Sequence, residues 1–238
     1  MSPNKAAPGR VLWLDAWRGV AVLVMLFWHL CWDLGLLGLI PLYRMEETPA
    51  VIVRLFIVCS FTLISGICAR FTRSGLRRGG ITLLAALLVT AVTWLAGEPA
   101  WFGILHLLGC CMLFYALAGK WLERLPDKVA FGAYLLLFLV WYGICYYGPR
   151  VQIPGLFIFG LRTPWFRSSD YYPLFPWGFL FLMGTVLGAR VRRDPRTGAG
   201  WPAPAPLRFL GRNALWIYLI HQPVLLGLLW LCTGHTIW

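Results

Sequence analysis

Long apolar stretches alternate along the chain with short segments that hold most of the charged residues. A helix needs about 20 apolar residues to cross a bilayer, and seven stretches come close to this length. Because hydrocarbon offers the backbone no hydrogen-bond partners, such runs predict α-helices, whereas a membrane β-barrel would show short segments of alternating polarity. The predicted spans are residues 11–39, 50–70, 80–97, 101–119, 129–147, 174–190 and 209–232.

The composition excludes a soluble protein. Hydrophobic residues make up 60% of the chain and charged residues only 13%, about half of the roughly 25% that soluble domains carry. The 14 Trp and 9 Tyr residues are amphipathic rings of the kind that collect at membrane interfaces. We therefore expect an all-α, polytopic transmembrane helical bundle of about seven spans, built as a single domain over residues 1–238.

The distribution of Lys and Arg predicts the orientation, because cytoplasmic loops carry an excess of these residues. One set of connecting segments is strongly basic and the opposite set is not, which places the N-terminus in the cytoplasm and the C-terminus outside. A bacterial cytoplasmic (inner) membrane is the expected location, and no soluble basic surface is left for nucleic acid. The basic set is Lys5, Arg10, Arg70, Arg73, Arg77, Arg78, Lys120, Arg124, Lys128, Arg190, Arg192, Arg193, Arg196, Arg208 and Arg212.

The sequence also predicts how some of the spans and loops are packed. The spans at 80–97 and 101–119 are joined by only a few residues, so they should be antiparallel neighbours. Gly184 and Gly188 are one helical turn apart and permit close helix contact. The outer loop 148–173 is rich in aromatic residues and Pro. It is apolar enough to lie on the membrane surface, as a lid or binding segment would.

The seven Cys residues lie within or at the ends of the predicted spans. An odd number without a C-x-x-C pair argues against a disulfide framework and against a zinc site, so we expect small packing residues. Three histidines together with Asp33 are the alternative metal site. However, no single helix offers an H-x-x-x-H-type pair of ligands, and no metal is expected.

The first predicted span carries four ionisable residues, namely Asp15, Arg18, His29 and Asp33. At about 100° per residue they fall within roughly 60° of one another and form one stripe, about 27 Å long. Lipid does not tolerate such a stripe, so it must face protein or a water-filled passage. An i, i+3 ion pair at the cytoplasmic end would by itself account for Asp15 and Arg18.

His29 and Asp33 are the strongest catalytic candidates in the sequence. They stand at i and i+4, a spacing at which a carboxylate can orient an imidazole and favour its charged form. General-base chemistry uses this arrangement of a base and its orienting group. The alternative is a polar pair that only packs inside the bundle.

Two further histidines are expected at a depth similar to that of His29. His106 lies early in the fourth span, which starts from the outer face. His221 lies in the outer half of the seventh span. Three histidines at one level favour a shared polar cavity, supported by Tyr218 and Gln222 on roughly the same face as His221. A lone intramembrane histidine, in contrast, is as often a satisfied packing residue.

Two strings in the first span are specific in combination: RVLWLDAWRG at residues 10–19 and MLFWHLCWDL at residues 25–34. They resemble the heparan-alpha-glucosaminide N-acetyltransferase catalytic-domain family and its small bacterial relatives, within the membrane acyltransferase superfamily. The resemblance covers nearly the whole chain. Its further strings are ISG at 64–66, GILHLLG at 103–109, YPLFPW at 172–177, FLGRN at 209–213 and YLIHQP at 218–223.

This resemblance implies transfer of an acyl group, in the first place acetyl from cytoplasmic acetyl-CoA, to a hydroxyl or amine acceptor such as a sugar or glycolipid. Heparan itself is not the expected acceptor for so small a chain. Carried over by motif, His29 would be the catalytic base or a transient acyl carrier, and Asp33 would orient it. Arginines suit the CoA phosphates at the cytoplasmic mouth. The residues expected there are Asp15, Arg18, Arg73, Arg77, Arg78, Arg212 and Asn213.

Two other functions stay open on the sequence alone. A small transporter or proton-coupled permease would use the stripe from Asp15 to Asp33 as its polar pathway, although the internal repeats typical of such proteins are not visible. A membrane scaffold without activity is the other. A homodimer is one assembly open to each of these functions.

Overall fold

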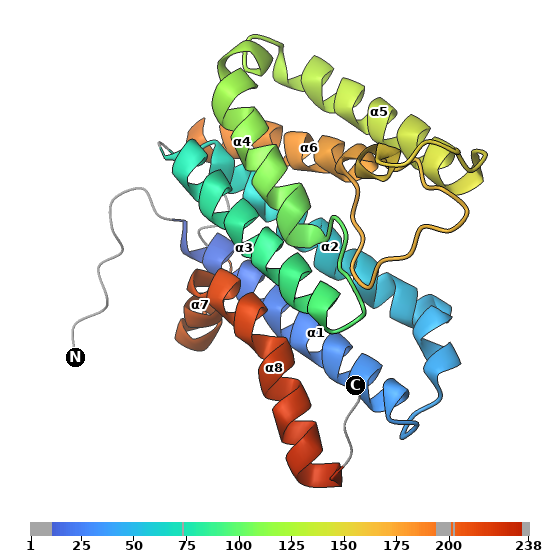
Figure 1. Ribbon diagram of the computed structural model, residues 1–238. Coiled ribbons are helices and arrows are strands. Elements are labelled where there is room, and N and C mark those ends of the chain that lie inside the picture. Colours follow the sequence, from blue (N-terminus) through green and yellow to red (C-terminus); the bar gives the residue numbers. More distant parts are fainter. Residues whose placement is uncertain (1–10, 73, 194–200, 202, 235–238) are drawn as a thin grey trace, which may run out of the picture. The chain divides into compact units, whose positions relative to one another are not determined.

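Figure 1 shows the computed structural model, which describes residues 11–72, 74–193, 201 and 203–234. Within this described part the regular structure consists of eight α-helices and two short 3₁₀-helices, without strands. In chain order the elements are α1 (Leu12–Leu36), η1 (Leu42–Glu46), α2 (Thr48–Ala69), α3 (Gly75–Leu95), α4 (Ile104–Leu122), α5 (Asp127–Tyr147), η2 (Leu156–Phe159), α6 (Leu174–Arg193), α7 (Ala205–Arg212) and α8 (Ala214–Thr233).

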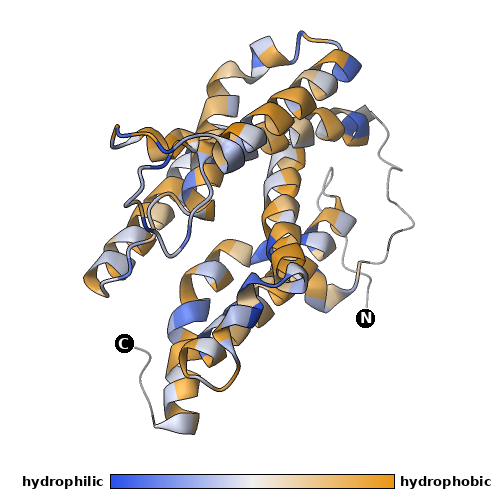
Figure 2. Ribbon diagram, turned by 90° about the vertical axis from the view of Figure 1, so that its right-hand side faces the viewer, coloured by the Kyte–Doolittle hydropathy of each residue, from blue (hydrophilic) through white to orange (hydrophobic). Residues whose placement is uncertain are grey.

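Seven of these helices, all but α7, are long and apolar enough to cross a membrane. The predicted number of spans is therefore confirmed, and each long helix overlaps one predicted stretch. Apolar residues dominate the long helices in Figure 2. Only 11% of the spanning window is buried in α5 and likewise in α8. Helices that expose so much apolar surface suit a solvent of lipid tails rather than water.

The predicted last span at 209–232 is wrong at its start, because its first residues belong to α7. Asn213, with φ −101° and ψ 14°, separates α7 from α8. The short helix α7 follows the extended residue Pro204 and carries Pro206 in its first turn. Proline is tolerated there because the first N–H groups of a helix have no partner within it. The apolar pattern alone did not mark this break.

The chain forms two compact units. The first combines residues 1–61 with 195–238, and the second holds residues 62–194, so the boundary falls inside α2. In the first unit α1 packs against α7 and α8. In the second unit α3 packs against α4, and α6 packs against both α4 and α5. A single domain over the whole chain stays a prediction.

The pairing of α3 with α4 in the second unit is as predicted. A Cβ added to Gly75 would meet Ala116, and one added to Gly109 would meet Leu83. Contacts later in α3 therefore involve earlier residues of α4, so the two helices are antiparallel neighbours (Figure 1).

Small residues bring α6 against the second half of α2 in the second unit. A Cβ on Gly184 would lie 2.5 Å from the Leu63 carbonyl oxygen, and one on Gly188 would lie 2.7 Å from the Ile67 carbonyl oxygen. Gly66 on α2 faces α6 in the same way. The expected close contact at Gly184 and Gly188 is confirmed, and its role is packing of backbone against backbone.

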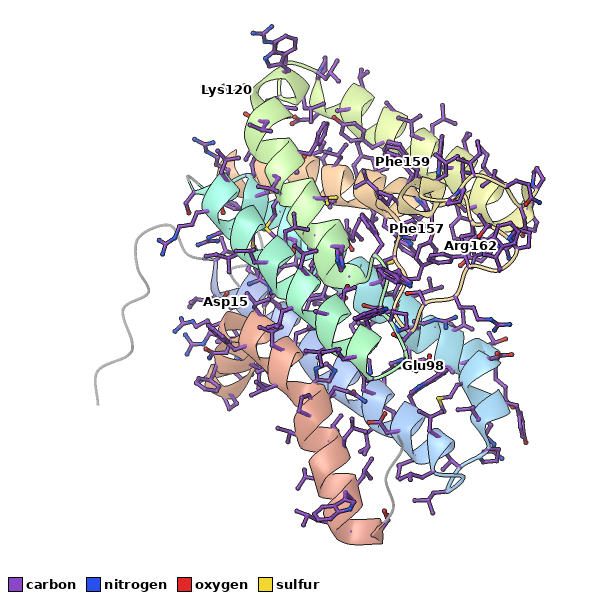
Figure 3. All side chains as sticks on the ribbon, viewed as in Figure 1. Asp15, Glu98, Lys120, Phe157, Phe159 and Arg162 are labelled. Atoms are coloured by element: carbon purple, nitrogen blue, oxygen red, sulfur yellow. The ribbon has the colours of Figure 1, made fainter. Side chains whose placement is uncertain are left out.

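The outer loop packs against helices of its own unit. The indole of Trp141 on α5 donates to the Phe159 carbonyl oxygen at 2.7 Å, and the Tyr171 hydroxyl donates to the Phe157 carbonyl oxygen at 2.6 Å. Figure 3 shows Phe157, Phe159 and Arg162 on this loop, next to α5 and α6. Burial raises the pKa of the Tyr171 phenol, and the positive charge of Arg162 opposes that shift. The phenol therefore stays a neutral donor.

The contact between α2 and α6 leads to a stability prediction. Gly184→Ala should lower the free energy of unfolding by about 1–3 kcal/mol, because the added methyl overpacks a backbone contact. Gly143→Ala on α5 is the matched control, since no atom lies within 4 Å of its added Cβ. It should be neutral or stabilising by up to about 1 kcal/mol. Thermal unfolding in one detergent measures both, and equal midpoints would contradict the close contact.

Candidate functional site

The polar stripe of α1 faces protein within the first unit. Asp15 and Asp33 are buried, with 6% and 1% of their surfaces exposed, and Arg18 and His29 are half-buried. The contacts described next come mainly from α7 and α8, which pack against α1. Protein therefore covers the two carboxyl groups of the stripe.

At the start of α1, the carboxyl group of Asp15 lies between two arginines (Figure 3 labels Asp15). Its Oδ1 is 3.8 Å from Arg18 Nη1, and its Oδ2 is 3.5 Å from Arg212 Nε of α7. The expected ion pair with Arg18 is present. Two guanidinium groups thus lie around one carboxylate at this end of the helix.

Two glycines bring α7 close enough to α1 for this cluster to form. A Cβ on Gly211 would collide with the Asp15 carbonyl oxygen, and a Cβ on Gly19 would collide with the Leu207 carbonyl oxygen. Neither contact leaves room for a side chain. Arg212 follows Gly211 directly, so the close approach of the two backbones also delivers the guanidinium to Asp15.

The remaining residues expected at the CoA phosphates are differently placed. Asn213 donates from Nδ2 to the Phe209 carbonyl oxygen at 2.9 Å and so stabilises the end of α7. Arg77 and Arg78 are exposed at the start of α3, in the second unit, and Arg78 Nη1 donates to Thr72 Oγ1 at 3.4 Å. Arg73 lies outside the described residues.

Farther along α1, Asp33 is bound by α8. Gln222 Nε2 donates to Asp33 Oδ1 at 2.8 Å and to Asp33 Oδ2 at 3.0 Å. The sequence suggested His29 as the partner of this carboxyl group, but in the described part of the chain no hydrogen bond joins the two. The i, i+4 spacing places His29 and Asp33 on one face of α1. The hydrogen bonds to the Asp33 carboxyl group nevertheless come from Gln222 on α8.

One turn before Asp33, His29 meets a second histidine. The ring centroids of His29 and His221 are 4.6 Å apart, with an angle of 62° between the ring planes. His221 is 7% exposed, and its Nδ1 is 2.6 Å from the carbonyl oxygen of Tyr218, whose ring lies 5.4 Å away. Two predicted members of the polar cavity, His221 and Gln222, thus lie against the two predicted catalytic residues.

His106 belongs to the second unit, where it has partners of its own. Its Nε2 is 3.4 Å from Thr90 Oγ1, and its ring stacks on Phe102 at 5.6 Å. Thr90 donates its hydroxyl hydrogen to the Ala100 carbonyl oxygen, so it accepts from His106. These contacts stabilise the connection between α3 and α4. A cavity shared by His29, His106 and His221 stays a prediction.

A further polar cluster in the second unit was missed by the sequence analysis. Arg70 Nη1 is 2.8 Å from Glu123 Oε1 and donates to the Tyr115 hydroxyl at 3.1 Å, and that hydroxyl donates to Glu123 Oε1 at 2.7 Å. The three residues border a small pocket with Asp127 and Tyr134. In the sequence, Arg70 contributes only to the prediction of which connecting segments face the cytoplasm. The two-turn spacing of Tyr115 and Glu123 was a signal that could have marked the cluster.

The described residues contain no group of three His, Cys, Asp or Glu side chains that could hold a metal ion. All seven cysteines belong to this part of the chain, and no disulfide joins them.

One comparison with known proteins identifies a family. The family model described as "Heparan-alpha-glucosaminide N-acetyltransferase, catalytic" matches residues 10–223. A search of curated proteins and a search of solved structures each find no match. The matched range contains α1, α7 and the part of α8 that carries His221 and Gln222.

The pairing of Asp33 with Gln222 leads to a second stability prediction. Gln222→Leu should destabilise the protein by roughly 1.5–3 kcal/mol, because it leaves a buried carboxyl group without its donor. Asp33→Leu should cost a similar amount, and the double variant should recover part of the loss. Gln152→Leu at an exposed position is the matched control. Unfolding by denaturant gives the four values, and strictly additive losses would contradict the pairing.

Proposed function

This chain belongs to the heparan-alpha-glucosaminide N-acetyltransferase catalytic-domain family, and on that premise we propose that it moves an acetyl group from cytoplasmic acetyl-CoA to a hydroxyl or amine acceptor at or across the bilayer. The chain is an integral membrane protein of an acetyltransferase family. The donor, the acceptor and the direction of transfer are the proposal. The contact of the α1 stripe with α7 and α8 is the observation that carries it.

The arginines at the start of α1 support a phosphate site. Arg18 and Arg212 each keep part of the side chain exposed, 21% and 35%, while the Asp15 carboxylate between them is 8% exposed. A carboxylate that pairs with two guanidinium groups fixes their position, and the more exposed of the two, Arg212, can bind a further anion through its remaining N–H groups. Phosphate groups of CoA fit this chemistry. Asp15 is then a positioning residue for both arginines.

The distance along α1 supports a site for the thioester near His29. Asp15 and His29 are 14 residues apart, which is about 21 Å along a helix at 1.5 Å per residue. CoA carries its thioester on a long arm away from its phosphates, so one molecule can contact both ends of the stripe. We assign to His29 the catalytic role at the thioester, as base or as transient acyl carrier.

The acceptor we propose is a sugar or a glycolipid, reached from the bilayer or its outer face. The proposed location is a bacterial cytoplasmic membrane, and the proposed assembly includes a homodimer. Arg73, Arg77 and Arg78 would add positive charge on the cytoplasmic side, where the distribution of Lys and Arg places them.

The proposed reaction predicts acetyl transfer by the purified protein. The probes are acetyl-CoA with an alkyl glucoside or the matched alkyl glucosaminide, which differ only by hydroxyl or amine. His29→Ala should abolish turnover. Arg212→Gln should raise the KM for acetyl-CoA about 10–100-fold, the equivalent of a lost charge-assisted hydrogen bond.

Two controls sharpen this test. Arg124→Gln removes the same charge from an exposed residue that contacts Trp121, and its KM should equal that of the wild type. S-acetylpantetheine has the thioester without any phosphate, so the effect of Arg212→Gln should disappear with this donor. A wild type that neither binds acetyl-CoA nor transfers acetyl groups would contradict the proposal.

The orientation gives an independent prediction. A C-terminal fusion to alkaline phosphatase should be active in bacterial cells, because this enzyme folds only outside the cytoplasm, and an N-terminal fluorescent fusion should fluoresce. The reverse pattern would place the arginines of the stripe on the wrong side for cytoplasmic CoA.

A further inference from the structure

The contacts of His221 determine which of its nitrogens carries the proton. Nδ1 lies 2.6 Å from the Tyr218 carbonyl oxygen, and a carbonyl oxygen can only accept a hydrogen bond. Nδ1 is therefore the protonated nitrogen of the neutral ring. Nε2 then carries the lone pair, and this buried atom has no hydrogen-bond partner among the residues that the structure describes.

The side-chain amide of Gln222 is oriented in a similar way. Both oxygens of Asp33 accept from Gln222 Nε2, so the amide nitrogen faces the carboxyl group and the amide oxygen points elsewhere. Oε1 of Gln222 is also buried, and within the described part of the chain it has no hydrogen-bond partner. By holding Nε2 of Gln222, Asp33 fixes the orientation of the whole amide. It thereby sets the direction of Gln222 Oε1, which is a second hydrogen-bond acceptor beside His221 Nε2.

The two unpaired atoms belong to adjacent residues of α8 that both contact α1 within one turn of that helix, at His29 and Asp33. A buried acceptor without a donor costs about 1–3 kcal/mol, and native structures contain few of them. Two such atoms side by side in the sequence, both acceptors, suit a ligand that brings O–H or N–H groups.

We propose that His221 Nε2, in place of His29, is the base that takes the proton of the attacking acceptor. Gln222 Oε1, held in position by Asp33, accepts a second hydrogen bond from the same acceptor molecule. This assignment rests on the proposed acetyltransferase function and adds to it the acceptor site. The ring contact with His29 places this base next to the residue assigned to the thioester.

The chemical step balances with these groups. The acceptor oxygen or nitrogen forms a bond to the carbonyl carbon of the thioester as its proton moves to His221 Nε2. The carbon–sulfur bond then breaks, and the CoA thiolate receives that proton. The products are the acetylated acceptor and CoA with a free thiol, and His221 returns to its starting form. In this step His221 and Gln222 act on the acceptor, His29 keeps its assigned place at the thioester, and Asp33 is a positioning residue.

The state of the imidazole can be measured without any activity. In the full chain labelled with ¹⁵N in its histidine rings, NMR should show His221 protonated on Nδ1 with a lone pair on Nε2. His221→Asn assigns the signals by their loss. His106 is an internal contrast, because its hydrogen bond to Thr90 predicts a proton on Nε2. A proton on Nε2 of His221 at the pH of activity overturns the proposal.

Transfer kinetics test the role of the base. With acetyl-CoA and an alkyl glucoside, His221→Gln should lower kcat about 10²–10⁴-fold, the usual contribution of a general base. With hydroxylamine, which attacks without losing a proton first, the loss should stay below about tenfold. Imidazole added to His221→Gly should restore part of the glucoside rate. Equal losses with both acceptors would indicate a structural role and overturn the assignment.

Asp33→Asn tests the positioning. It removes the charge that holds the Gln222 amide, so the KM for the glucoside should rise while the KM for acetyl-CoA stays unchanged. A wild type without transfer to any acceptor contradicts the acetyltransferase proposal itself. If the wild type transfers and Asp33→Asn leaves the acceptor KM unchanged, the role of the Asp33–Gln222 pair is wrong.

Discussion

A carboxyl group inside a membrane span needs hydrogen-bond donors or a counter-charge from the protein. The first unit contains two such groups, Asp15 and Asp33. Hydrocarbon offers neither water nor a counter-charge, so Asp15 and Asp33 on α1 need donors from the protein, and other helices contribute to both. Arg212 supplies one and Gln222 the other. Both donors come from the C-terminal part of the chain, which explains why this unit combines the two ends of the sequence.

The glycines decide whether these polar contacts can form. At the crossing of α1 with α7 the backbones approach so closely that Gly19 and Gly211 have no room for a side chain. Among lipid tails there is little hydrophobic driving force between helices, so close packing and hydrogen bonds carry the association. Packing at the crossing and the Asp15–Arg212 pair therefore depend on each other, because either one fixes the distance that the other needs.

The hydrophobic pattern predicted the seven spans and the face of α1 that avoids lipid, because both follow from length and helical periodicity. It could not predict the partner of Asp33. Periodicity assigns a residue to a face, but Gln222 lies 189 residues away and only the packing of α1 on α8 brings it there. The break at Asn213 was missed for a related reason, since α7 has only 8 residues and its sequence runs directly into the apolar stretch of α8.

The histidine pair shows how the backbone of one helix can prepare a side chain for chemistry. A neutral imidazole carries its proton on either Nδ1 or Nε2. A buried carbonyl oxygen next to Nδ1 selects the tautomer with the proton on Nδ1. For His221 that oxygen belongs to Tyr218, one turn earlier on α8. The lone pair at Nε2 therefore follows from helix geometry and needs no carboxylate. Asp33 is then available to hold Gln222, so the two polar residues of α8 can be positioned independently at the same stretch of α1.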